Sequence, residues 1–228
     1  MIIAERKPID ELKSIVEPYE RILLVGCGTC VAVCFAGGEK ETATLASLLR
    51  MATRLDGHEK TFDEAIVQRQ CEWEFLDEIK DRVDDYDLIL SLACGIGVQA
   101  IVERFPQVRV APALNTTFLG LPVEQGVWAE RCQACGNCIL HLTGGICPIA
   151  RCAKSLLNGP CGGSQNGHCE IDPNVDCAWH LIYERLKAQG QLELLEEIQP
   201  PKDWSTSRDG GPRRIVREDL KRVERGSE

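Results

Sequence analysis

The chain has 228 residues, 44% hydrophobic and 27% charged, which is typical of a folded globular protein. Its 35 Asp and Glu residues outnumber its 26 Lys and Arg residues, so the formal net charge is −9. That charge disfavours a nucleic-acid partner bound through its phosphates. The sequence starts without an apolar signal segment and contains no run of eighteen apolar residues, so we expect a cytoplasmic protein without a membrane span.

The first 112 residues alternate between the patterns of strands and helices. Short apolar runs predict strands at 21–25, 63–69, 87–92 and 108–111. Apolar residues at helical spacing predict helices at 40–53, 72–83 and 98–105. Strands that alternate with helices predict a Rossmann-like α/β domain, with a parallel sheet covered on both faces.

The pattern changes at about residue 112. Residues 113–199 are rich in Gly, Cys and Pro and show little apolar periodicity before a predicted helix at 175–189 and a further turn or two at 192–198. Such a segment lacks a core large enough to fold alone, and bound metal can supply the missing stability. Residues 200–228 predict an extended tail of net charge +2, from eight basic and six acidic residues. We expect this tail to dock a partner; a solvated tail is the alternative.

Thirteen cysteines are the unusual feature of the composition. Structural disulfides are rare in a reducing cytoplasm, so many spaced cysteines there indicate metal or redox chemistry. Histidine is scarce, which favours all-cysteine ligation over mixed Cys/His zinc sites. The four histidines are His58, His141, His168 and His180.

Cys132, Cys135 and Cys138 form a C-x2-C-x2-C run, which is typical of a ferredoxin-like [4Fe-4S] loop. Cys147-Pro148 follows after eight residues in place of the usual three, so its cluster is open, and a zinc knuckle is the alternative. Eight cysteines in this region suffice for two clusters; one cluster plus free structural thiols is the other interpretation. The eight are Cys132, Cys135, Cys138, Cys147, Cys152, Cys161, Cys169 and Cys177.

The first domain has five cysteines of its own, each beyond the carboxyl end of a predicted strand. They are Cys27, Cys30, Cys34, Cys71 and Cys94. Open α/β sheets place their ligands at that edge, so four of the five are expected to bind a third cluster, without an indication of which four. A dinucleotide site is disfavoured, because Val31 stands where a G-x-G-x-x-G motif has its third glycine.

These motifs together resemble one family over nearly the whole chain. The residues concerned are CGTCVAVCFAGG at 27–38, RQCE at 69–72, ACG at 93–95, RCQACGNC at 131–138, LNGPCGG at 157–163 and Asp203-Trp204. The chain resembles the iron–sulfur small subunit (MetV) of MetVF-type methylenetetrahydrofolate reductase. The LNGPCGG stretch is the most specific part of the resemblance, since it is not a general ferredoxin pattern.

The resemblance implies an electron-transfer subunit without a catalytic site of its own, acting in one-carbon metabolism (the Wood–Ljungdahl pathway). Two to three [4Fe-4S] clusters on this chain would exchange electrons with FMN or FAD on a larger TIM-barrel (MetF-like) subunit that reduces methylenetetrahydrofolate. Further electron-transfer subunits are possible partners. Two alternatives stay open: a zinc-stabilised assembly subunit without a redox role, and a ferredoxin-like adaptor of a heterodisulfide-reductase or hydrogenase complex.

Overall fold

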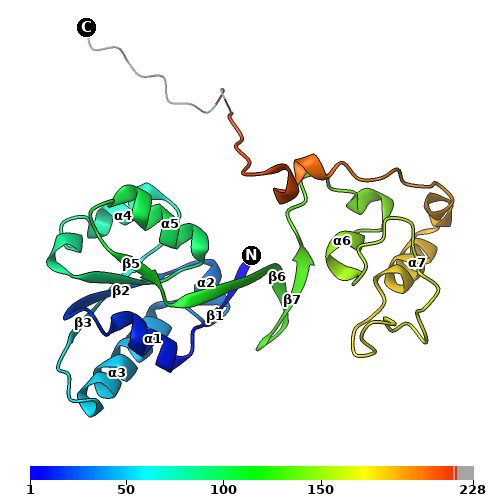
Figure 1. Ribbon diagram of the computed structural model, residues 1–228. Coiled ribbons are helices and arrows are strands. Elements are labelled where there is room, and N and C mark those ends of the chain that lie inside the picture. Colours follow the sequence, from blue (N-terminus) through cyan, green and yellow to red (C-terminus); the bar gives the residue numbers. More distant parts are fainter. Residues whose placement is uncertain (218, 220–228) are drawn as a thin grey trace, which may run out of the picture. The chain divides into compact units, whose positions relative to one another are not determined.

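The computed structural model describes residues 1–217 and residue 219 (Figure 1). The chain forms two compact units, Met1–Arg131 and Cys132–Glu228, and each is described by itself below. The boundary predicted at residue 112 lies inside the first unit, because the strands that follow it pair back onto the amino terminus.

The first unit contains a four-stranded parallel sheet in the order β3-β2-β4-β5. Its strands are β2 (Arg21–Cys27), β3 (Thr61–Val67), β4 (Leu88–Leu92) and β5 (Val110–Pro112). The chain adds β3 on one side of β2 and then β4 on the other, so the strand order reverses between β2 and β4. Open α/β sheets bind ligands outside the carboxyl ends of the strands at such a reversal. The predicted α/β class with a parallel sheet is confirmed.

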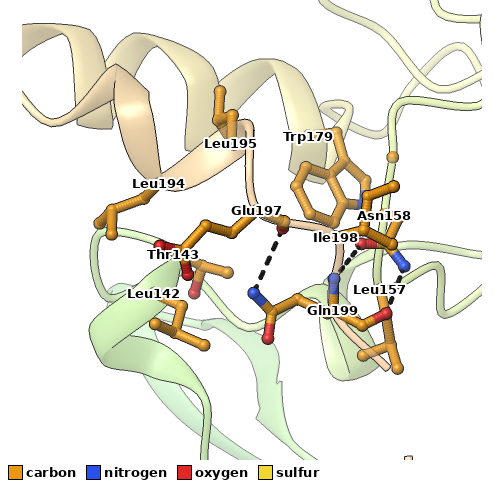
Figure 2. A pocket seen from close by; sticks show the side chains of 11 residues that line it. Leu142, Thr143, Leu157, Asn158, Trp179, Leu194, Leu195, Glu197, Ile198 and Gln199 are labelled. Carbon is orange, nitrogen blue, oxygen red and sulfur yellow. Dashed lines mark hydrogen bonds between the residues drawn. The ribbon is translucent and has the colours of Figure 1, made fainter. Parts of the chain in front are cut away.

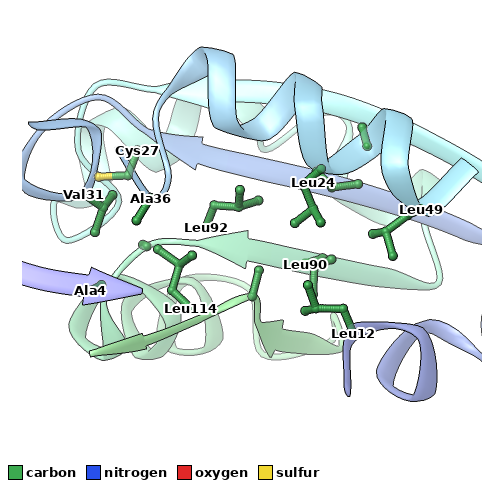
Figure 3. Packing of buried hydrophobic residues seen from close by; sticks show 14 of the residues in the cluster. Ala4, Leu12, Leu24, Cys27, Val31, Ala36, Leu49, Leu90, Leu92 and Leu114 are labelled. Carbon is green, nitrogen blue, oxygen red and sulfur yellow. The ribbon is translucent and has the colours of Figure 1, made fainter. Parts of the chain in front are cut away.

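Helices cover both faces of this sheet (Figure 1). Side chains alternate along β2, so that Ile22 and Leu24 pack into one core and Leu23 and Val25 into the other. Figure 3 shows Leu24 in the first of these cores. Burial on both faces explains why the strand reads as a continuous apolar run. The helices of the first core are α1 (Ile9–Val16) and α3 (Glu39–Leu55), and those of the second are α4 (Trp73–Leu76) and α5 (Gly95–Arg104).

The helix predicted at 72–83 is wrong as a continuous element. The chain forms α4, the 3₁₀ turn η1 (Asp77–Ile79) and, after a break, the 3₁₀ turn η2 (Val83–Asp85). Buried apolar side chains at 76, 79 and 83 still pack into the second core, and short turns satisfy that spacing as well as one helix does. Aspartates in the second half of the stretch also have low helix propensity.

A three-stranded sheet, β1-β6-β7, was not predicted. β1 (Ile2–Arg6) pairs antiparallel with β6 (Leu114–Glu124), and β6 continues through Gly126 into β7 (Val127–Cys132). Gly126 has a φ of +86°, which suits the two-residue connection. The low apolar periodicity directly after residue 112 therefore did not indicate that two strands form there. Local periodicity does not reveal a strand whose partner lies more than a hundred residues away.

The second unit is organised around a small core. Its helices are α6 (Pro148–Arg151) and α7 (Ala178–Gln189), with 3₁₀ turns η3 (Leu140–Leu142), η4 (Leu192–Leu195), η5 (Trp204–Thr206) and η6 (Arg208–Gly210). α7 and η4 confirm the helix predicted at 175–189 and the turn after it. Short helices, turns and isolated bridges stand in the described part of this unit where a ferredoxin-like module was predicted. The C-x2-C-x2-C spacing defines a loop, and it does not specify the fold around that loop.

No helix in the described part of the chain is both long and apolar enough to cross a membrane.

Candidate metal centres at the cysteines

All thirteen cysteines are free thiols, five in the first unit and eight in the second. A thiolate is a soft ligand suited to zinc or to an iron–sulfur cluster. The position of each thiol therefore decides which of the predicted ligand sets the fold supports.

Three cysteines of the first unit follow three neighbouring strands at the carboxyl edge of the parallel sheet, and we call them the switch-point site: Cys27, Cys71 and Cys94. Cys27 is the last residue of β2, Cys71 follows β3, and Cys94 lies between β4 and α5. Partial burial, followed by the charges of Cys27 and Cys94, raises the pKa of the Cys71 thiol. The structure thus brings together thiols that are 23 or more residues apart in sequence.

Cys30 and Cys34 stand at either end of the short helix α2 (Cys30–Val33) and differ in their surroundings. The Cys34 thiol donates hydrogen bonds to the carbonyl oxygens of Ala4 and Val31, both at 3.5 Å. Cys34 is buried in the first core, and this burial raises the pKa of its thiol. Cys30 is only partly buried. The five predicted candidates therefore do not occupy equivalent positions.

The loop of Cys132, Cys135 and Cys138 has a compact backbone with two left-handed residues. Ala134 has a φ of +51° and Gly136 a φ of +81°. The Ala134 N–H donates to the Cys132 sulfur at 3.3 Å. Backbone N–H groups that point at a ligand sulfur stabilise its negative charge, so this loop has a feature expected of a thiolate-ligand loop.

Part of the predicted tail contacts this loop, and we call residues 202–213 the tail segment. Three carbonyl oxygens of the loop accept its hydrogen bonds: that of Cys135 from Thr206 Oγ1 at 2.9 Å, that of Ala134 from Arg213 Nη1 at 2.7 Å and that of Asn137 from Lys202 Nζ at 3.3 Å. A Cβ added at Gly136 would lie 2.1 Å from the Thr206 carbonyl oxygen. The tail segment therefore packs against the loop of its own chain.

The partner-docking role of the tail stays a prediction. Residues 218 and 220–228 of the tail predicted at 200–228 lie outside the described residues.

Two further cysteines of the second unit lie at its small core. Cys177 precedes α7 and is buried with Trp179, Ile182 and Leu186, and Cys152 packs against this group. Burial alone would raise the pKa of Cys177, but hydrogen bonds from the Ser164 hydroxyl and from backbone N–H groups at the start of α7 lower it. The remaining three are Cys147, which directly precedes α6, the exposed Cys161, and Cys169 in the turn between the two helices.

Within the described residues, no group of three or more Cys, His, Asp or Glu side chains is arranged to hold a metal ion. The predicted ligand sets are therefore not assembled as single-ion sites. The donor set itself fits a cluster: the thiols are free, one loop directs an N–H at a sulfur, and three thiols follow neighbouring strands at one edge of the sheet.

A hollow of about 330 Å³ in the second unit lies beside the LNGPCGG stretch (Figure 2). The Asn158 side chain contacts the Gln199 backbone on both sides: Nδ2 donates to the carbonyl oxygen at 2.8 Å, and Oδ1 accepts from the N–H at 2.7 Å. The Trp179 indole donates to the Leu156 carbonyl oxygen at 3.0 Å. No cysteine lines this hollow, and Asn158 holds the residue directly before the predicted tail.

Residues 111–205 match the family described as "Methylene-tetrahydrofolate reductase C terminal". This match supports a relation to methylenetetrahydrofolate reductase. It covers less than half of the chain, and it includes all eight cysteines of the second unit but none of the five in the first. Comparison with curated proteins and with solved structures gave no match.

Proposed function

We propose that this chain is the electron-transfer subunit of a methylenetetrahydrofolate reductase, carrying two to three [4Fe-4S] clusters on its cysteines. The observation that carries the proposal is the coincidence of eight free cysteines with the segment that matches this reductase family. A bound [4Fe-4S] cluster supplies one-electron transfer. The flavin, FMN or FAD, and the folate would be bound by a larger TIM-barrel subunit.

The residues of this chain would bind the clusters and hold them in position. The thiolates are the ligands, the Ala134 N–H stabilises charge on the Cys132 sulfur, and the tail segment holds the loop that carries three of the thiols. A cytoplasmic location and further electron-transfer subunits are part of the same proposal.

The first experiment measures iron, zinc and acid-labile sulfide per chain on anaerobically purified protein. We expect about eight to twelve irons with matching sulfide. One or two zinc ions without sulfide would overturn the proposal in favour of a zinc-stabilised assembly subunit.

The folate connection needs a second experiment with the complex. When the reduced complex is mixed with methylenetetrahydrofolate, its flavin and clusters should reoxidise together, followed by their absorbance. Clusters that transfer electrons but no flavoprotein that responds to methylenetetrahydrofolate would instead indicate an adaptor of another redox complex.

A further inference from the structure

Gln70 is a fully buried amide directly before Cys71. Its Nε2 donates to the Val25 carbonyl oxygen on β2 at 2.7 Å, and its Oε1 accepts from the Ser91 hydroxyl on β4 at 2.6 Å. The Ser91 oxygen in turn accepts from the Ala93 N–H at 3.3 Å. A buried polar side chain is costly unless it is hydrogen-bonded, and these bonds satisfy this one on both sides.

Each element that Gln70 joins carries one thiol of the switch-point site. Val25 lies two residues before Cys27, Gln70 itself precedes Cys71, and Ala93 precedes Cys94. A shift of Gln70 would therefore move three thiols relative to one another.

The helix after Cys94 also packs on this amide. A Cβ added at Gly97 of α5 would lie 2.9 Å from the Gln70 Cβ. Gln70 thus contacts β2 and β4 on one side and α5 on the other.

The fourth thiol has two candidates, Cys30 and Cys34. Cys30 is the first residue of α2, three residues after Cys27 at the end of β2, and it is only partly buried. Cys34 follows the other end of α2 and donates to the carbonyl oxygens of Ala4 on β1 and Val31 on α2. Cys30 is thus the candidate next to the carboxyl end of β2, and the Cys34 thiol is directed at β1 and α2.

We propose that Gln70 positions a four-cysteine ligand set from which Cys34 is excluded. The set consists of Cys27, Cys30, Cys71 and Cys94. This inference rests on the proposed function, because it assigns the ligands of one of the proposed clusters.

The ligand set is tested by comparing Cys71→Ser with Cys34→Ser in the full chain. Cys71 is exposed, so its substitution should remove a ligand with little effect on folding. We expect Cys71→Ser to lose about four irons and four sulfides per chain and Cys34→Ser to lose none. Circular dichroism confirms that each variant is folded.

The other outcomes separate this inference from the proposed function. Wild-type protein without iron and sulfide would overturn both. Wild-type protein with clusters, but iron loss in Cys34→Ser or full retention in Cys71→Ser, would overturn the ligand set alone.

The positioning role is tested with Gln70→Met, which keeps the length of the side chain and removes its hydrogen bonds. The electron paramagnetic resonance signal that disappears in Cys71→Ser identifies the cluster of the first unit. We expect Gln70→Met to shift the g-values and the reduction potential of that signal and to leave the other signals unchanged. Gln99→Met is the matched control, because Gln99 is exposed on α5 and should change none of them.

Should Gln70→Met fail to fold, Ser91→Ala removes one of the same hydrogen bonds at a smaller cost. An unchanged first-unit signal in whichever of the two variants folds would overturn the positioning role.

Discussion

The two units present their cysteines in different ways. In the first, apolar cores on both faces of a parallel sheet hold the strand ends that Cys27, Cys71 and Cys94 follow. In the second, four buried residues form the centre of the core, and most of the eight cysteines lie on loops around it. The comparison teaches that two apolar cores fix the strand ends that carry the thiols of the first unit, whereas the second unit has only a small core. On the proposed function, we expect the second unit to depend on its clusters for part of its folding.

Removal of the proposed clusters should have the largest effect. It should accelerate amide exchange in the second unit and leave the first unit protected. When iron is chelated anaerobically, we expect amide exchange in 132–217 to accelerate by about two orders of magnitude or more, while β2 and β4 stay protected. Hydrogen-exchange mass spectrometry with and without chelator measures both. Equal loss of protection in the two units would contradict the comparison, and adding back iron and sulfide is the control.

Leu90→Ala should destabilise the first unit without destabilising the second. Leu90 is fully buried in β4, so its truncation should lower the free energy of unfolding of the first unit by about 2–5 kcal/mol. Urea denaturation followed separately in the two units measures the change. Leu55→Ala, at a leucine that is 88% exposed on α3, should change it by less than about 0.5 kcal/mol. Destabilisation that spreads equally into the second unit would mean that the units do not fold independently.

Gly136→Ala tests whether close packing against the cysteine loop holds the tail segment in the second unit. Gly136 and Gly145 have similar left-handed φ values of +81° and +86°, but only the Cβ at Gly136 would meet the Thr206 backbone. We therefore expect Gly136→Ala to cost about 1–3 kcal/mol more than Gly145→Ala, the usual range for overpacking. The extra cost should appear as faster proteolysis within the tail segment. Equal cleavage in the two variants would show that the contact with Thr206 does not hold the tail.

Asp87→Asn should give the smallest effect and should be confined to the first unit. Hydrogen bonds from the backbone N–H groups of Arg21 and Glu20 hold the pKa of the Asp87 carboxyl below its usual value. A carboxyl whose pKa is lower in the folded state stabilises the protein above the unfolded-state pKa of about 3.9, and this contribution is lost as the pH falls through the folded-state pKa.

Wild type should accordingly be more stable than Asp87→Asn at pH 7, and the difference should begin to shrink only as the pH falls below about 4. Urea titrations between pH 7 and pH 3 measure the difference, with Asp81→Asn as the surface control. A difference that persists at low pH would mean that Asp87 does not act through its charge.

Much of the first unit could be predicted because its signals are local. The apolar run at β2, the helical spacing of α3 and the cysteines after the strands all appear within short windows of sequence. The pairing of β1 with β6 could not be predicted, because the two strands lie at opposite ends of the unit in the sequence. The β6–β7 hairpin is local and was missed. The RQCE stretch at 69–72 contributed to the family resemblance, but it did not indicate that β2 and β4 enclose the Gln70 side chain.

By itself the sequence determined the α/β class, the placement of cysteines at strand ends and the C-x2-C-x2-C loop, because these follow from residue type and spacing along the chain. The tertiary structure alone decided which cysteine-bearing strands are neighbours and that the tail segment binds its own loop. Those relations join residues far apart in the chain, and packing determines their distances where local pattern does not.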